Sequence, residues 1–292
     1  MNELHLHIDG SLRRETLKEW CPDLNVNSFG FRKGMNLREC LACFDITVAA
    51  VNSPERIQRV VKEICEDQQR RGVSKSELRF APHIHQATPA EMLDGATRGL
   101  DENTNLVLCG LYGFDPKKIE ELVELAKNNS RVVGIDIAGG PKSTDKWGLH
   151  HYVDAYQEAK KYGIGRTIHV SEGRGPQEII DAITMLDAQR LGHACSLLDS
   201  DEALELVLSK GTIIEACPTS NLHTGIYQSP SHHPIRKWIE KGVRVSVCAD
   251  NSLMSATNTI KELWSTRFFC SLTDDHHKWI EESSQLGLFR RE

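Results

Sequence analysis

Short apolar runs alternate with longer stretches of helical periodicity along most of the chain. Eight of these runs are rich in β-branched and large apolar residues, as strands are. They cover residues 4–8, 77–81, 105–111, 132–137, 165–170, 189–193, 212–216 and 244–249. The stretches between them include segments with the apolar spacing of helices, several of which begin with Pro or Asp as helices often do. These segments include residues 54–71, 116–128, 150–161, 176–186, 201–209 and 233–241.

The repeated alternation of strand and helix predicts parallel βα units. Eight such units in 292 residues fit an α/β fold of the (β/α)8 TIM barrel type, which usually has about 250 residues plus insertions. A doubly wound open sheet is the alternative, but no GxGxxG or GxxxxGK[ST] loop follows the first strand. We therefore expect a single barrel domain over residues 1–292.

Two segments lie outside the regular alternation of this predicted barrel. Residues 21–51 form the longest stretch without a strand, and we expect a partly helical insertion there, after the first strand. This insertion either covers a site as a lid or packs against the barrel wall, and the sequence favours neither. Residues 275–292 are predicted to form a closing C-terminal helix and tail.

Composition and charge narrow the range of partners. Lys and Arg number 35 against 41 Asp and Glu, so the net charge is −6, and without a basic cluster neither nucleic acid nor an anionic membrane is expected. The chain has no apolar run near the roughly 20 residues of a membrane span, and its N-terminus does not resemble a signal peptide. Nine scattered cysteines favour free thiols in a reducing compartment. We expect a cytoplasmic protein with a small-molecule partner, and its oligomeric state stays open.

Reactive side chains follow the apolar strands at the ends where a barrel carries its active site. His5 and His7 are two residues apart on the first strand and should therefore face the same side. His169 ends the fifth strand, His193 ends the sixth and Asp250 ends the eighth. Each has an ordinary explanation alone, such as a buried histidine or a helix-capping aspartate. Their shared position at the strand ends makes a common site the better interpretation.

Histidines and a carboxylate in this arrangement predict a site for one divalent ion, with zinc favoured. The expected ligands are His5, His7, His169 and Asp250. A zinc site of this kind leaves room for a water molecule, whose pKa falls to about 7. Glu172, in the loop after the fifth strand, and His193 would then lie nearby as groups that transfer protons.

Ordered blocks of residues along nearly the whole chain resemble the adenosine deaminase family. They are His5-Leu6-His7-Ile8-Asp9-Gly10-Ser11-Leu12, Glu77-Leu78-Arg79-Phe80-Ala81-Pro82, Gly134-Ile135-Asp136-Ile137-Ala138-Gly139, His169-Val170-Ser171-Glu172, Leu191-Gly192-His193, Cys217-Pro218-Thr219-Ser220-Asn221 and the strand end at Asp250. The resemblance extends from residue 3 to about residue 260. It is specific for a zinc-dependent aminohydrolase of the barrel type and less specific for the substrate.

The resemblance implies a role for each candidate residue. One zinc ion per chain would be held by the four ligand candidates, and zinc-bound hydroxide would attack C6 of a purine. Glu172 would protonate ring nitrogen N1, and His193 would assist deprotonation of the water. Asp9 would accept a hydrogen bond from the ribose 5′-hydroxyl, Gly139 would offer its backbone N–H to N3, and the side-chain amide of Asn251 would donate to N7.

Some positions depart from the usual pattern of the family. Val170-Ser171 replaces Ala-Gly, Ala194 replaces a glycine, Tyr112 lies in a turn where an arginine is frequent, and Asn251 replaces an aspartate. We expect deamination of adenosine and 2′-deoxyadenosine to inosine and 2′-deoxyinosine. The alternatives are another 6-aminopurine, such as adenine, N6-methyl-AMP or a modified nucleoside, and a non-catalytic nucleoside-binding barrel. Relatives that act on free adenine usually carry Glu where this chain has Asp9, which favours a nucleoside unless Asp9 merely caps the next turn.

Overall fold

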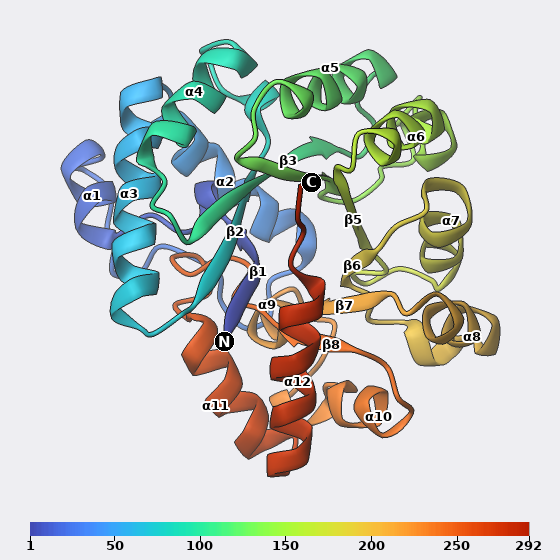
Figure 1. The fold of residues 1–292 in the computed structure, drawn as a ribbon. Helices are drawn as coiled ribbons and strands as arrows, with labels where there is room; N and C mark the ends of the chain where they lie inside the picture. The colour runs from blue at the N-terminus through green and yellow to red at the C-terminus, as the bar shows by residue number, and fades with distance from the viewer. Residues whose placement is uncertain (292) are drawn as a thin grey trace. The chain divides into compact units, whose positions relative to one another are not determined.

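Eight parallel strands alternate with helices along residues 1–291, the part of the chain that the structure, a computed structural model, describes (Figure 1). The strands are β1 (Asn2–His7), β2 (Lys75–Phe80), β3 (Thr104–Leu111), β4 (Val132–Ala138), β5 (Gly165–Val170), β6 (Arg190–His193), β7 (Ile213–Ala216) and β8 (Val245–Val247). They follow one another in the sheet in chain order, and a parallel bridge joins Leu6 on β1 to Asp250 after β8. The prediction of a (β/α)8 TIM barrel is confirmed.

Each predicted strand overlaps an observed one, and the ends differ by at most two residues. The registers that place the site are those of β1 with β2 and of β5 with β6. His7 lies opposite Arg79 in the first pair, and His169 lies opposite Gly192 in the second. The carboxyl ends of these strands therefore present their last side chains at neighbouring positions within each pair.

The helices begin, in several cases, where the sequence supplies a side-chain cap. They are α1 (Arg14–Trp20), α2 (Leu37–Ala50), α3 (Pro54–Arg70), α4 (Pro89–Gly99), α5 (Pro116–Lys127), α6 (Val153–Lys161), α7 (Gln177–Leu186), α8 (Asp201–Lys210), α9 (Pro218–His223), α10 (Ile235–Glu240), α11 (Thr259–Phe269) and α12 (Asp274–Gly287), with short 3-10 turns η1 (Ile8–Gly10), η2 (Pro82–Ile84), η3 (Leu149–Tyr152), η4 (Leu197–Asp199) and η5 (Pro230–His232). Ser53 and Thr88 accept hydrogen bonds from first-turn N–H groups of α3 and α4, and each helix has Pro at its first position.

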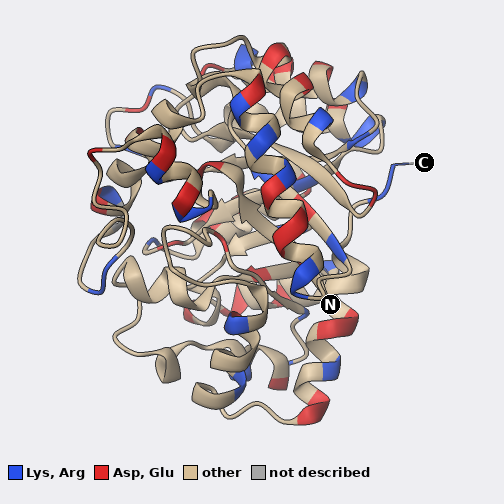
Figure 2. Ribbon diagram, turned by 90° about the vertical axis from the view of Figure 1, so that its left-hand side faces the viewer, with Lys and Arg blue, Asp and Glu red and all other residues tan. Residues whose placement is uncertain are grey.

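Neither the distribution of charged residues nor the hydropathy of the helices indicates a special surface. Acidic and basic residues are interspersed along the ribbon rather than gathered by sign (Figure 2). Within residues 1–291, a helix long and apolar enough to cross a membrane is not found.

The chain is organised as two compact units. The first comprises residues 1–105, 217–233 and 247–271, and it contains β1, β2 and the segment that follows β8. The second comprises residues 106–216 and 234–246 together with the C-terminal residues from 272, and it contains β4 to β7.

The insertion predicted after the first strand belongs to the first unit and contains α2. Asn36 and Glu39 form a capping box at its start. Phe31 donates its backbone N–H to the carbonyl of Met254 at 2.6 Å, and Phe31, Cys40 and Met254 form a buried cluster. The insertion is therefore attached to the same segment that carries Asp250.

In the second unit, the C-terminal tail packs against the amino-terminal ends of the strands. The guanidinium of Arg190 lies 3.6 Å from the centroid of the Phe289 ring and donates to the carbonyl of Gly287 at 2.7 Å. A Cβ added to Gly165 would lie 2.2 Å from that ring. The missing side chain at Gly165 thus provides the space that Phe289 fills.

Candidate active site

In the first unit, β1 directs two imidazoles toward one carboxylate. Nε2 of His5 lies 3.4 Å from Oδ1 of Asp250, and Nε2 of His7 lies 3.5 Å from the same oxygen. The three side chains are 0%, 13% and 5% exposed. Backbone hydrogen bonds fix this arrangement, because Asp250 N–H donates to the His5 carbonyl at 2.8 Å and His7 N–H donates to the Asp250 carbonyl at 2.7 Å.

A buried glutamate that the sequence analysis missed, Glu3, supports these residues through hydrogen bonds. Glu3 accepts hydrogen bonds from the backbone N–H of His5 at 2.8 Å and of Ala249 at 3.0 Å, and from Thr259 Oγ1 at 2.6 Å. Burial raises the pKa of the Glu3 carboxyl, although each of these hydrogen bonds acts in the opposite direction. Glu3 therefore ties β1 to the residue that precedes Asp250.

The geometry around Asp250 fits a metal ion better than a hydrogen-bonded pair. Both His–Asp distances exceed the roughly 2.7–3.2 Å of ordinary hydrogen bonds. Two ligands of a tetrahedral zinc ion, each about 2.0–2.1 Å from the metal, lie about 3.4 Å apart. Imidazole nitrogens and a carboxylate oxygen are also donors that zinc accepts. These residues therefore fit a divalent ion.

In the second unit, a histidine at the end of β5 is oriented by an acid on β4. Nδ1 of His169 lies 3.1 and 3.0 Å from the two carboxylate oxygens of Asp136, and both residues are buried. Because a carboxylate only accepts, Nδ1 carries a proton, and Nε2 is the ring nitrogen that could bind a metal ion. Metal-bound histidines are usually oriented in this way. An acid within an otherwise apolar strand is the sequence signal that could have indicated Asp136.

The two residues expected to transfer protons lie close together in the second unit. Oε2 of Glu172 lies 3.9 Å from Nε2 of His193, and both residues are buried. The loop around Glu172 is fixed by two contacts: Arg174 donates to the Glu172 carbonyl at 3.2 Å, and Ser171 N–H donates to Glu178 at 2.7 Å. Glu172 is thus held by its own loop at the end of β5.

Several residues at the strand ends that carry the candidate site residues have strained backbone conformations. Ser171, His193, Ala194 and Asp250 all have positive φ, at 54°, 63°, 48° and 59°. Such conformations cost non-glycine residues about 1–3 kcal/mol each and often occur at functional sites. Ala194 therefore has a conformation that favours glycine, the residue that the family resemblance leads one to expect there.

The residues expected to recognise the substrate also follow strands. In the first unit, Asn251 packs over Gly10, where an added Cβ would lie 1.9 Å from the side-chain oxygen of Asn251. Asp9 lies in η1 and contacts His85, the residue that follows η2. In the second unit, Gly139 follows β4 with φ of 74°, and among the described residues beyond its two chain neighbours no atom lies within 4 Å of the position its Cβ would take.

One departure from the family pattern, Tyr112, contacts the candidate histidine at the end of β5 directly. The hydroxyl of Tyr112 donates to the backbone carbonyl of His169 at 2.7 Å. Burial raises the pKa of this phenol. Tyr112 therefore remains protonated as a donor, and it holds the end of β5.

Each unit contributes buried side chains of types that could bind a metal ion. They are His5 and Asp250 in the first unit, and His169 and His193 in the second. His5, His169 and Asp250 were expected as ligands from the sequence, and His193 was expected to transfer protons. His7, the remaining expected ligand, contacts Asp250 within the first unit.

Sequence comparison connects the chain to proteins of known activity. A family model described as adenosine deaminase matches residues 1–285. An adenosine deaminase of Clostridium botulinum (strain 657 / Type Ba4) is 31% identical over 313 residues, which cover 98% of this chain and 93% of that protein.

Solved structures share the fold at lower sequence identity. An adenine deaminase from Arthrobacter aurescens has a TM-score of 0.89 at 17% identity, covering 100% of this chain and 94% of that one. The arabidopsis N6-mAMP deaminase MAPDA has a TM-score of 0.86 at 22% identity, with 99% and 93% covered. An amidohydrolase from Burkholderia ambifaria, solved with bound Zn, has a TM-score of 0.86 at 18% identity, with 99% and 85% covered.

Proposed function

Because the chain belongs to the adenosine deaminase family, we propose that it converts adenosine and 2′-deoxyadenosine to inosine and 2′-deoxyinosine with release of ammonia. Family membership itself establishes a hydrolytic deaminase that acts on a purine amino group. The observation that carries the finer proposal is the convergence of His5 and His7 on Asp250 at a distance suited to a metal ion.

We assign one zinc ion to four ligands, His5, His7, His169 and Asp250. The donor types, the 3.4 and 3.5 Å distances to Asp250 and the orientation of His169 by Asp136 support this assignment. The amidohydrolase from Burkholderia ambifaria was solved with bound Zn. A bound zinc ion would lower the pKa of a water molecule so that hydroxide is available near neutral pH.

Glu172 and His193 supply the proton transfers that deamination requires. Attack at C6 turns a ring carbon tetrahedral, so N1 must accept a proton as the bond forms, and we assign this donation to Glu172. His193 accepts the proton that the attacking water loses. Their separation of 3.9 Å and the fixed loop around Glu172 support a shared role at one reacting centre. A binding module would need neither group, which argues against a non-catalytic barrel.

Three residues and one segment are assigned to substrate recognition. Asp9 accepts a hydrogen bond from the ribose 5′-hydroxyl, Gly139 donates its backbone N–H to N3, and the Asn251 amide donates to N7. We also propose that residues 21–51 cover the site, since they pack on Met254 a few residues beyond Asn251.

The alternative substrate is another 6-aminopurine. Ser171, which takes the place of a family glycine, has φ of 54° and donates to Glu178, and Tyr112 donates to the carbonyl of His169. These contacts involve the residue before Glu172 and the backbone of His169, so the two departures lie beside the candidate site residues. The adenine deaminase and the N6-mAMP deaminase among the solved structures define which substrates to compare with adenosine.

Ammonia release by zinc-loaded and chelator-treated protein tests the proposal. Adenosine, 2′-deoxyadenosine, adenine and N6-methyl-AMP are compared at equal concentration. We expect zinc-dependent release, fastest from the two nucleosides. Absence of release from every substrate with zinc confirmed bound would contradict the reaction, and a better rate with adenine or N6-methyl-AMP would contradict the substrate.

A further inference from the structure

His85 connects three parts of the first unit through its ring. Nε2 lies 3.2 Å from Oδ1 of Asp9, and Nδ1 lies 2.9 Å from the carbonyl oxygen of Val51, the residue that follows α2. The ring of Phe80 lies against the imidazole, with 6.1 Å between centroids. The His85 side chain is 0% exposed and that of Asp9 is 5% exposed. The imidazole is therefore fixed in a buried position beside Asp9.

The partners of His85 favour its protonated form. A carbonyl oxygen and a carboxylate both accept hydrogen bonds, and an imidazole presents N–H to both only when doubly protonated. Burial lowers the pKa of His85, but the contact with Asp9 and the Val51 carbonyl more than reverse this effect, so the pKa is raised. A buried carboxylate requires a polar partner within the protein, and His85 lies close enough to be that partner for Asp9.

We propose that His85 is a positioning residue that holds the Asp9 carboxylate for the 5′-hydroxyl and thereby selects nucleosides over free bases and 5′-phosphates. This inference rests on the proposed deaminase function. Oδ1 of Asp9 faces His85, so the second carboxylate oxygen is the one that accepts from the ligand hydroxyl. A free base offers no such donor. A 5′-phosphate would place a charge of about −1.5 to −2 against the carboxylate.

The position of His85 also links recognition to the insertion over residues 21–51. The carbonyl of Val51 contacts Nδ1 of His85, and Val51 itself donates its N–H to the Thr47 carbonyl at 2.9 Å. The residue after α2 and the Asp9 carboxylate therefore both contact the His85 side chain. This contact holds the ring in the orientation that Asp9 requires.

Two substrates that differ only in the 5′-hydroxyl test this role. Adenosine and 5′-deoxyadenosine are compared through kcat/KM, and the wild type should prefer adenosine by about 10- to 100-fold, the effect of one hydrogen bond to a charged group. His85→Leu fills the space without an N–H group and should bring the ratio close to one, mainly through KM for adenosine. His85→Gln keeps an N–H donor and should retain most of the preference.

Binding of the products gives a readout that is independent of turnover. The dissociation constants of inosine and 5′-deoxyinosine, measured by calorimetry, should show the same loss of discrimination in His85→Leu. The matched control is His232→Ala, which removes an exposed imidazole from the same unit and should keep the wild-type ratio. Melting temperatures of the variants report whether each remains folded.

The outcomes separate this inference from the proposed function. An equal loss for both substrates in His85→Leu would show a merely structural role and overturn the inference. A wild-type ratio near one, or AMP as good a substrate as adenosine, would overturn it as well. Absence of ammonia release from adenosine would overturn the proposed reaction, and the inosine pair would still decide the role of His85.

Discussion

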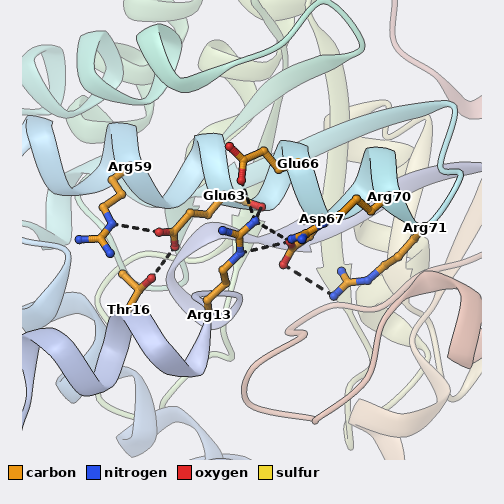
Figure 3. A network of polar contacts seen from close by, with 8 residues as sticks. All are labelled: Arg13, Thr16, Arg59, Glu63, Glu66, Asp67, Arg70 and Arg71. Atoms are coloured by element: carbon orange, nitrogen blue, oxygen red, sulfur yellow. Dashed lines mark hydrogen bonds and ion pairs between the residues drawn. The ribbon is translucent and has the colours of Figure 1, made fainter.

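Two clusters in the first unit pair nitrogen-containing side chains with carboxylates, but at different distances. One lies at the surface between α1 and α3 and contains Arg13, Thr16, Arg59, Glu63, Glu66, Asp67, Arg70 and Arg71 (Figure 3). There, Arg13 lies 2.7 Å from Asp67 and 2.8 Å from Glu66. The other is the buried group of His5, His7 and Asp250, whose N–O distances are 3.4 and 3.5 Å.

The distances distinguish a structural network from a site. Contacts of 2.7–2.8 Å are typical of charged hydrogen bonds, so the carboxylates of the surface cluster have partners within the protein. That cluster attaches Arg13, at the start of α1, to α3. The longer distances around Asp250 instead suit groups that share a ligand. Geometry, more than residue type, indicates which cluster is the better candidate for a metal site.

Removal of the shared carboxylate should have the largest effect on the buried cluster. Asp250→Ala removes the group that both His5 and His7 face, and we expect metal affinity to fall by more than the 10- to 100-fold typical of outer-shell changes. Ammonia release should fall below that of any other variant. Metal content after dialysis, measured by mass spectrometry, checks this.

The surface cluster supplies the control for that variant. Asp67→Asn removes a charge from the same unit and should leave metal content at the wild-type level. Full metal content in Asp250→Ala, or equal loss in Asp67→Asn, would contradict the distinction between the clusters.

The next largest effect should come from the residue assigned to protonate N1. Glu172→Gln keeps the shape of the side chain but removes its acid function, so kcat should fall by about 10²- to 10⁴-fold. Metal content should not change, because Glu172 is not among the assigned ligands. Stopped assays of ammonia release and metal analysis on the same sample check both statements. Near wild-type turnover would show that another group donates the proton.

The sheet could be predicted from the sequence more completely than the helices. Buried parallel strands are nearly continuous apolar runs, and all eight were located within two residues at each end. Helix α11 is absent from the predicted helices. Its Trp264 and Phe268 are 69% and 78% exposed, so the apolar face that periodicity detects is blurred.

The site shows the same limit at the level of single residues. His5, His169 and Asp250 became candidates through their positions at strand ends, because active sites of barrel enzymes lie at these ends. The contacts of Asp136 with His169, and of His85 with Asp9, join separate strands and turns. Local patterns do not contain such pairings, so the sequence analysis named Asp136 only within a family block and did not single out His85.

A smaller effect on the metal site should follow from the loss of Asp136. Asp136→Ala removes the acceptor that fixes the Nδ1 proton of His169, and metal affinity should fall by about 10- to 100-fold. Asp136→Asn keeps an oxygen acceptor but no charge, and its affinity should lie between those of the wild type and the alanine variant. Competition with a chelator of known affinity measures both. Unchanged affinity in Asp136→Ala would show that the protein orients His169 by other contacts.

The smallest effect should come from the surface cluster and should concern stability alone. Burial would raise the pKa of Asp67, but hydrogen bonds from Arg13 and Arg70 and the charge of Arg71 hold it below the usual 3.8. Asp67→Asn should lower the free energy of unfolding at pH 7 by about 1–2 kcal/mol, since each partly exposed ion pair contributes little. Urea titration measures the difference, with the exposed Asp23→Asn as control.

The pH dependence of that difference gives the sharper test. The folded state binds the Asp67 proton more weakly than the unfolded state, so its contribution is fully present above the unfolded pKa near 3.8 and is lost as pH falls through the lower folded value. The two proteins should therefore converge in stability as pH falls below about 4. High salt should also reduce the gap at pH 7, because partly exposed pairs are screened. If the difference in unfolding free energy between the wild type and Asp67→Asn persisted at low pH, packing rather than charge would explain the lower stability of the variant.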